Sequence, residues 1–489
     1  MKPIEFRCSL DGSIVALPHV WERIVGSDHA TMALRADYQA QLRRAHEELG
    51  FQYVRFHGLL SDDMGTLVQQ GSDRIYSFFN AHRVWDALLD AGMRPFVELS
   101  FMPTAIASGH STVFRYRGNV TPPKQWSDWR ELIRRLTASG VARYGAAEVE
   151  RWFFEVWNEP NLRAFWRGSR AQYFRLYREA ARAIKEVAPE LKVGGPATAQ
   201  NAWIDEFLDD CERTGTPVDF VSTHHYPTDS VQHVTGGTEA QLAAMQRDIL
   251  CEEAQDSRRR ARDKSLFYTE WNTSANDRDP LHDDPYAAAF IIRTILQANG
   301  LVDGYSFWTF SDLFEEQYFP SHPFHGGFGL LTLDGIAKPS YRAFELLHRL
   351  GTELVTPIDG MHANVAAWVV RDGRRATVLV VNSAPPRHDL ILARIVMHLD
   401  TAATVRAATI ERIDDDHANA KRRWIEMGSP EYLQPAEVQE LHAASMLRVE
   451  PHHVTVDADG IHVAVDLPSN SVAAVTLELA GDLSWAAHG

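Results

Sequence analysis

The 489-residue sequence contains little cysteine and no long hydrophobic run. Cys8, Cys211 and Cys251 are an odd number of cysteines without a Cys-x-x-Cys pair, which argues against a disulfide framework and favours a reducing compartment. No stretch approaches the roughly 18 consecutive apolar residues of a membrane span. The N-terminal segment has no apolar signal-peptide core and carries an acid at Glu5. We therefore expect a cytoplasmic protein with no membrane partner.

Positive charge is also scarce. The chain has 49 Lys and Arg against 65 Asp and Glu, a formal net charge of −16. Because nucleic-acid binding depends on clustered Lys and Arg, we expect no nucleic-acid partner. The basic run at residues 258–260 lies beside Glu252, Glu253 and Asp256, which indicates a solvated helix face. Hydrophobic residues make up 45% of the chain, which is typical of a globular protein with a substantial core.

Short apolar runs alternate with helix-length segments from the N-terminal region to about residue 351. We expect eight strands, at residues 14–17, 52–57, 94–101, 152–158, 191–194, 218–224, 266–270 and 305–310. Most of these runs are continuously apolar, as parallel strands covered on both faces are. The pattern predicts an α/β fold, a (β/α)8 TIM barrel over residues 14–351. A doubly wound sheet is the rival, but no glycine-rich phosphate turn follows an early strand.

The pattern of apolar and polar residues changes after residue 351. Short segments with period-2 alternation are separated by turn signals such as Asp372-Gly373 and Asp459-Gly460. This pattern predicts a C-terminal β-sandwich accessory domain over residues 352–489, interrupted by a helical insertion at residues 416–444. Residues 1–13 could add a strand to this second domain. The pattern leaves the oligomeric state open and is compatible with an oligomer.

Two glutamates stand at the ends of separate predicted strands, each next to aromatic residues. Glu159 follows the fourth strand, where Pro160 cannot continue the hydrogen-bond ladder. Glu270 ends the seventh strand. The carboxyl ends of barrel strands form the mouth where active sites lie. Either glutamate alone is explained as a cap or an ion pair, but the pair suits cleavage of a glycosidic bond, with one protonated acid and one ionised nucleophile.

The segments around these glutamates, FEVWNEPNL at residues 154–162 and YTEWN at residues 268–272, resemble the signatures of a large clan of retaining (β/α)8 glycosidases. Within that clan, nearly the whole chain resembles the β-xylosidases of glycoside hydrolase family 39. Further matching motifs occur in order along the chain: RFHG (55–58), RGNVTPP (117–123), STHHYP (222–227), SFWTFSDLFEE (306–316) and FHGGFGLL (324–331).

The resemblance implies a general acid and base at Glu159 and a nucleophile at Glu270, with a glycosyl-enzyme intermediate and net retention. It implies substrate-binding roles for His57, Asn158, His224, Tyr226, Trp308, Glu315 and Glu316. In these roles Asn158 would contact the sugar 2-hydroxyl and Trp308 would form the apolar floor. Residues 165–166 could face the leaving group. The implied activity is that of an exo-β-1,4-xylosidase acting on a xylooligosaccharide or a related pentoside.

Other titratable residues receive a structural interpretation. His224 and His225 could suggest a metal, but metal-dependent barrel hydrolases usually carry a His-x-His pair early in the barrel, and the predicted first strand has none. We therefore expect no metal and no cofactor. Glu98 and Glu155 lie within predicted strands, where a buried partner explains them better than catalysis does.

Several other functions stay open at this point. An α-L-arabinosidase, with sole or dual activity, is an alternative because arabinose shares much of the hydroxyl arrangement of xylose. An α-L-iduronidase would demand Lys or Arg close to the pocket, where the sequence offers Glu315 and Glu316. An endo-acting glycanase would need an open groove, whereas residues 312–335 could close one end. A non-catalytic carbohydrate-binding protein predicts the loss of a catalytic glutamate, and both are present.

Overall fold

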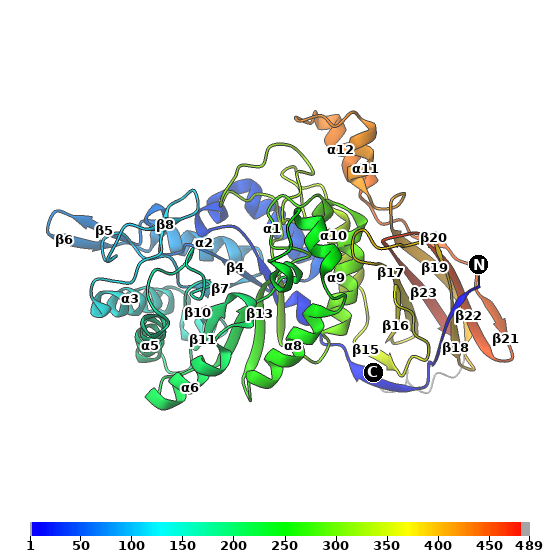
Figure 1. The fold of residues 1–489 in the computed structure, drawn as a ribbon, viewed down its shortest axis with the longest axis horizontal. Helices are drawn as coiled ribbons and strands as arrows, with labels where there is room; N and C mark the ends of the chain where they lie inside the picture. Colours follow the sequence, from blue (N-terminus) through cyan, green and yellow to red (C-terminus); the bar gives the residue numbers. More distant parts are fainter. Residues whose placement is uncertain (1, 481–489) are drawn as a thin grey trace.

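Eight parallel strands close into a barrel in the computed structural model, which describes residues 2–480 (Figure 1). Around the barrel they follow chain order: β3 (Ile24–Gly26), β4 (Tyr53–Phe56), β7 (Arg94–Glu98), β10 (Phe153–Glu155), β11 (Lys192–Thr198), β12 (Phe220–His224), β13 (Ser265–Trp271) and β14 (Gly304–Phe307). Strand β14 pairs with β3 and completes the ring. The predicted α/β fold, a (β/α)8 barrel, is therefore confirmed.

Helices separate the barrel strands along the chain. The longer ones are α1 (Ala36–Leu49), α2 (Phe79–Asp90), α3 (Trp126–Tyr144), α5 (Arg170–Val187), α6 (Ile204–Thr214), α8 (Ile249–Arg260), α9 (Pro285–Gln297) and α10 (Pro339–His348). Helix α5 illustrates how the sequence sets such an element. The Ser169 hydroxyl accepts from the Gln172 N–H while the Gln172 side chain accepts from the Ser169 N–H, a capping box. Its apolar side chains then recur at helical spacing and are buried.

Smaller elements lie in the loops between the barrel strands. They are the two-stranded sheets β5 (Leu67–Gln70) with β6 (Asp73–Tyr76) and β8 (Thr112–Val113) with β9 (Gly118–Asn119), and the short helices α4 (Ala146–Val149) and α7 (Thr238–Ala244). Among the described residues, none of the helices combines the length and the apolar character that crossing a membrane requires.

The inside of the barrel changes character from one end to the other. Phe96, Phe153, Phe220 and Phe267 fill the end at which the strands begin, together with Ile24. Their rings lie in mutual contact, with centroids 5.2 Å apart for Phe96 and Phe153. Nearer the carboxyl ends of the strands, the interior includes the fully buried charged side chains Arg55, Glu98 and Glu155. The barrel therefore has an apolar plug beneath a polar mouth.

The prediction of a first barrel strand at residues 14–17 is wrong. Strand β2 (Ser13–Ala16) is exposed throughout and pairs antiparallel with β15 (Glu353–Thr356) outside the barrel. The first barrel strand is the three-residue β3, which is fully buried between β14 and β4. It escapes a pattern search because it is short and directly follows the charged residues Glu22 and Arg23.

Two further sheets form a β-sandwich beside the barrel. The seven-stranded sheet has the order β2, β15, β16 (Val365–Asp372), β17 (Arg375–Asn382), β23 (Ser471–Ala480), β19 (Thr404–Ile413) and β20 (Glu450–Pro451). The four-stranded sheet has the order β1 (Ile4–Ser9), β18 (Ala393–Asp400), β22 (Gly460–Leu467) and β21 (Thr455–Asp457). Strand β1 pairs in parallel with β18, so the N-terminal segment contributes to the sandwich. Residues 481–489 of the predicted domain lie outside the described residues, and its boundary at residue 352 stays a prediction.

The alternation along β17 explains how the sandwich is attached to the barrel. Val378 and Val380 belong to the core between the two sheets, whereas Leu379 and Val381 belong to the core shared with the barrel. Successive side chains of a strand point to opposite faces, so one strand serves both cores. Helices α9 and α10 contact this sheet from the barrel side.

The predicted helical insertion is present as α11 (Ala420–Glu426) and α12 (Pro435–Ala444), which project from the body of the molecule (Figure 1). Trp424 and Leu441 of this pair pack against Phe324 and Ile336 of the long loop that follows β14.

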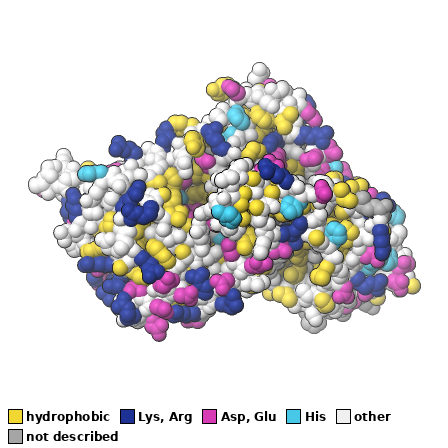
Figure 2. All heavy atoms as spheres, in the orientation of Figure 1, with side chains coloured by type: hydrophobic (Ala, Val, Ile, Leu, Met, Phe, Trp, Pro, Cys, Tyr) yellow, Lys and Arg dark blue, Asp and Glu magenta, His cyan; other side chains and the backbone are white. Residues whose placement is uncertain are grey.

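Charges of both signs are mixed on the surface, as the face in Figure 2 shows. In the basic run at the end of α8, each arginine has an acidic partner. Arg258 pairs with Asp303 at 3.0 Å, Arg259 with Asp256 at 2.8 Å, and Arg260 with Asp205 at 2.8 Å.

Candidate active site

The two glutamates singled out from the sequence face each other at the barrel mouth. Glu159 lies in the loop after β10, with a left-handed φ of 43°, and its N–H donates to the Ala197 carbonyl at 2.8 Å. Glu270 lies in β13, one residue before the strand ends. One oxygen of each carboxylate lies within 4.8 Å of the other. Retaining glycosidases hold their two carboxyl groups at about 5–5.5 Å.

Glu270 is surrounded by hydrogen-bond donors. Its Oε1 accepts from Arg55 Nη1 at 2.7 Å, and its Oε2 accepts from the Tyr226 hydroxyl at 3.0 Å. Burial, followed by the charges of Glu270 and Glu159, raises the pKa of Tyr226 well above its usual value, so the phenol stays protonated and donates. Donors on both oxygens suit a carboxylate that works in its ionised form.

Arg55 brings a fully buried guanidinium into this network. Its Nε donates to Glu155 Oε2 at 2.6 Å, and its Nη2 donates to Asn158 Oδ1 at 2.9 Å and lies 2.9 Å from Glu98 Oε2. Burial opposes the charge, but Glu155, Glu98 and Glu270 outweigh it and raise the pKa of Arg55. The buried partner expected for Glu98 and Glu155 is therefore Arg55, to which sequence reasoning assigned no role. Its place two residues before His57 puts both on the same strand face, which is the signal that could have revealed it.

Glu159 has a different environment from Glu270. Its Oε1 lies 3.0 Å from His224 Nδ1, and His224 Nε2 lies 3.1 Å from the Thr269 hydroxyl. Burial, with the charges of Arg55 and His57, lowers the pKa of His224 well below its usual value, so the imidazole is neutral. Burial, followed by the negative charges of Glu270 and Asp229, raises the pKa of Glu159 well above its usual value. Glu159 is therefore suited to hold a proton and to give it up during a reaction.

A cavity of about 250 Å³ opens between these carboxylates. Of the predicted site residues, it is lined by His57, Asn158, Glu159, Tyr226, Glu270, Trp308 and Glu316. The remaining lining residues, which sequence reasoning left without a committed role, include Phe114, Leu162, Phe165, Gln200, Asp229, Gln232 and Phe328. Leu162 and Phe328 lie within the matching motifs at residues 154–162 and 324–331, but the sequence does not show which side chains of these loops face the cavity.

The groups that could bind sugar hydroxyls gather beside Glu270. His57 Nδ1 lies 2.6 Å from Glu98 Oε2, which leaves Nε2 facing the cavity, 3.5 Å from Glu270 and 3.4 Å from Glu316. Glu316 Oε1 is buried without a hydrogen-bond partner among the described residues. Burial, with the charges of Asp28 and Glu270, raises the pKa of Glu316 well above its usual value. The Trp308 ring lies with its centroid 4.7 Å from that of His57 and provides an apolar wall.

Two predicted site residues do not line the cavity. The Glu315 carboxylate accepts from Arg35 Nη1 at 3.0 Å, and its backbone N–H donates to Asp28, so this side chain points away from the cavity. His224 stands behind Glu159, where it orients the carboxylate. Of residues 165–166, which could face the leaving group, only the first lines the cavity. Phe165 is part of the lining, whereas Trp166 packs against Trp157 with ring centroids 5.1 Å apart.

Glu159, His224 and Glu270 are also the group of described residues whose ligand atoms lie close enough to hold a metal ion. Both ring nitrogens of His224 and both oxygens of Glu270 already have partners in the protein. This set suits a hydrogen-bonded acid and nucleophile, and the absence of a metal and a cofactor stays a prediction.

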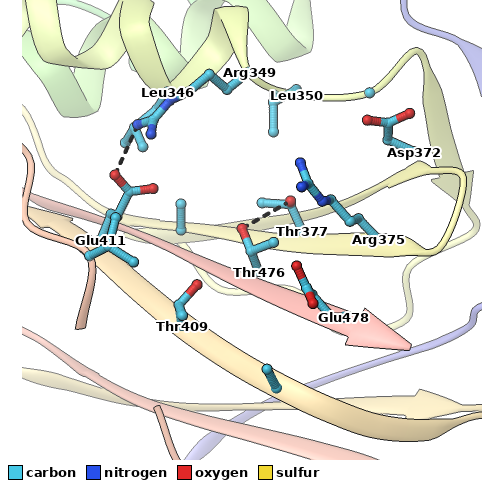
Figure 3. Close-up of a pocket in the computed structure, with 14 residues that line it drawn as sticks. Leu346, Arg349, Leu350, Asp372, Arg375, Thr377, Thr409, Glu411, Thr476 and Glu478 are labelled. Carbon is cyan, nitrogen blue, oxygen red and sulfur yellow. Dashed lines mark hydrogen bonds and ion pairs between the residues drawn. The ribbon is translucent and has the colours of Figure 1, made fainter. Parts of the chain in front are cut away.

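A second cavity, of about 380 Å³, lies between α10 and the seven-stranded sheet (Figure 3). Arg349 pairs with Glu411 at 3.0 Å across it, and Thr377 and Thr476 share a hydrogen bond of 3.3 Å on its floor. The described residues that line it include no aromatic ring on which a sugar could stack. Its lining fits an interface between the barrel and the sandwich better than a sugar site.

Known proteins are similar to this chain in architecture and in sequence. The family model for glycosyl hydrolases family 39 matches residues 11–460. A β-xylosidase of Caldicellulosiruptor saccharolyticus is 45% identical over 94% of this chain and 95% of its own, and one of Geobacillus stearothermophilus is 37% identical over 94% and 93%. The crystal structure of a monomeric β-xylosidase from Caulobacter crescentus CB15 is similar with a TM-score of 0.85, at 33% identity, over 97% of this chain and 99% of its own.

Proposed function

Because the chain belongs to glycoside hydrolase family 39, we propose that this glycosidase is a retaining exo-β-1,4-xylosidase. It releases xylose from the non-reducing ends of xylooligosaccharides by double displacement. The observation that carries this proposal is the pair of carboxylates within 4.8 Å of each other in opposite environments, Glu159 without a cationic partner and Glu270 on Arg55. The activity named for the two curated relatives supports xylose as the sugar.

In the first step, Glu270 attacks the anomeric carbon of the terminal xylose while Glu159 donates its proton to the glycosidic oxygen. A covalent glycosyl-enzyme forms and the shortened oligosaccharide leaves. Arg55 and Tyr226 hold the Glu270 carboxylate in place for this attack. In the second step, Glu159, now ionised, takes a proton from water, which displaces Glu270 from the anomeric carbon. Two inversions give net retention.

The cavity lining supports a neutral pentose at this position. None of the described residues that line the cavity is a lysine or an arginine, which a uronate would require. Asn158 Oδ1 is fixed by Arg55, so its amide is oriented for a sugar hydroxyl. The long loop that carries Glu316 closes one side, which suits removal of single terminal residues. An arabinoside remains the alternative substrate because its hydroxyls differ little from those of xylose.

The test is hydrolysis of an aryl β-D-xyloside, followed by NMR of the anomeric proton as xylose appears. We expect β-xylose as the first product. Formation of α-xylose first would mean inversion and would reject Glu270 as a nucleophile. Turnover of aryl α-L-arabinosides with none of the xyloside would reject the substrate and keep the mechanism.

A further inference from the structure

The cavity has two halves that come from different strands. His57, directly after β4, and Trp308 and Glu316, after β14, line one half, where His57 Nε2 lies 3.5 Å from the nucleophile Glu270. The loops after β10, β11 and β12 carry the acid Glu159 and the lining residues Leu162, Phe165, Gln200, Asp229 and Gln232. Of these residues, Asp229 lies near enough to Glu159 for its charge to raise the pKa of the acid. Since the nucleophile attacks the anomeric carbon and the acid protonates the departing oxygen, the first half holds the cleaved sugar and the second half faces the group that leaves.

The half beside Glu159 combines an apolar wall with a polar rim. Phe165 and Leu162 provide the apolar side. The polar side consists of Asp229, whose carboxylate accepts from the Tyr226 N–H at 3.0 Å and from the Gln232 amide at 3.4 Å, and which also bonds the Gln200 side chain. Both glutamines are exposed, so their amides are accessible to a ligand. An aromatic face opposed to amide and carboxylate groups is the usual chemistry of a sugar-binding site.

The backbone fixes Gln200 in this place. Gln200 and Asn201 both have left-handed φ angles, of 60° and 54°. The neighbouring Ala199 is tied to the loop of the acid, because its N–H donates to Asn161 Oδ1 at 2.9 Å and its carbonyl accepts from Asn161 Nδ2 at 3.0 Å. Non-glycine residues hold such conformations where the surroundings enforce them, often at ligand sites. The loops after β10 and β11 therefore form one rigid frame for the polar rim.

We propose that Gln200, Asp229 and Gln232 form the binding site for the leaving sugar, opposite Phe165. The ligand is a second pyranose with free hydroxyl groups, attached to the xylose that is cleaved. This inference rests on the proposed xylosidase function and extends it. The rim makes the enzyme prefer an oligosaccharide over a xyloside whose leaving group lacks hydroxyls.

The experiment compares two substrates whose leaving groups both need protonation, xylobiose and methyl β-D-xyloside. Only xylobiose presents hydroxyls to the rim. For Gln200→Ala and Gln232→Ala we expect kcat/KM on xylobiose to fall about three- to tenfold each, the value of a lost hydrogen bond or two, and kcat/KM on the methyl xyloside to change by less than about twofold. His233→Ala is the matched control, because His233 is exposed next to Gln232 but does not line the cavity.

Two other patterns of loss overturn the inference. Equal losses on both substrates would mean that the glutamines act through Glu159, and no loss on either would mean that they do not contact the leaving sugar. If Gln200→Ala lowers the thermal unfolding midpoint, Gln232→Ala carries the test alone. A wild-type enzyme inactive on both xylosides would reject the proposed function itself, and this inference with it. Activity on the methyl xyloside with none on xylobiose would reject the leaving-sugar site and the oligosaccharide substrate, and would keep the xylosidase chemistry.

Discussion

Glu159 and Glu270 are the same residue type at the same barrel mouth, yet their surroundings make them opposites. Glu270 accepts from a guanidinium on one oxygen and from a phenol on the other. Glu159 meets a neutral imidazole, and burial together with the charges of Glu270 and Asp229 raises its pKa. Much of the difference comes from the buried cation Arg55, which hydrogen-bonds to Glu270, whereas the partner of Glu159 is the neutral His224. An acid and a nucleophile thus arise from identical side chains through their neighbours.

Removing the nucleophile is expected to have the largest effect. Glu270→Ala should lower kcat on activated and unactivated glycosides alike, on the order of 10⁴-fold or more, because neither substrate can form the covalent intermediate. Steady-state rates on a nitrophenyl xyloside and on xylobiose measure the loss. Azide should restore activity on the nitrophenyl xyloside and yield a glycosyl azide of inverted configuration. Substantial activity without azide would reject the nucleophile assignment.

Removing the acid should discriminate between substrates. For Glu159→Ala we expect a loss of about 10²- to 10⁴-fold on xylobiose, whose leaving alcohol needs a proton, and a much smaller loss in the first step on a dinitrophenyl xyloside, whose leaving group does not. Pre-steady-state release of dinitrophenol isolates that step. An equal loss on both substrates would mean that Glu159 is not the acid.

Replacing Arg55 by lysine tests how much its several contacts contribute. Arg55→Lys keeps the positive charge but cannot contact Glu155, Asn158 and Glu270 at the same time. We expect the free energy of unfolding to fall by about 2–3 kcal/mol, since hydrogen bonds to buried charged groups are lost. Urea denaturation measures it. Arg35→Lys serves as the control at an exposed ion pair, where a change below about 1 kcal/mol is expected. Equal stability of both variants would contradict the role given to Arg55.

The elements that could be predicted from the sequence are those with a local signal. Seven of the eight barrel strands coincide with predicted runs, most of which are continuously apolar because both faces of the strands are covered. β3 has only three residues, too few for a periodic pattern, and residues 14–17 offered a better apolar run that pairs with another sheet. The strand with which a segment pairs is not a local property of its sequence. A four-residue apolar run therefore does not show whether it belongs to the barrel or to another sheet.

The same limit applies within the site. Glu159 and Glu270 stand out because each ends an apolar strand next to aromatic residues. Arg55 lies in such a strand as well, but one arginine in an apolar run does not reveal three carboxylates from other strands. Glu315 and Glu316 are adjacent, and which of them faces the cavity depends on the path of the loop, with Arg35 taking the carboxylate of Glu315. Charge partners from distant segments decide these cases.

The smallest expected effect concerns the acid side alone. Burial raises the pKa of Asp229 to about 7, so Asp229 becomes ionised in the range where its negative charge raises the pKa of Glu159. Asp229→Asn removes that charge and keeps the shape, so the pKa of Glu159 should fall. Since the first step needs protonated Glu159, the basic limb of kcat/KM should move to lower pH, while kcat/KM for an aryl xyloside at pH 5 stays within about twofold of the wild type. A basic limb that stays at its wild-type position would mean that the charge of Asp229 does not raise the pKa of Glu159, and the contrast with Glu270 would then have to come from other neighbours such as Arg55.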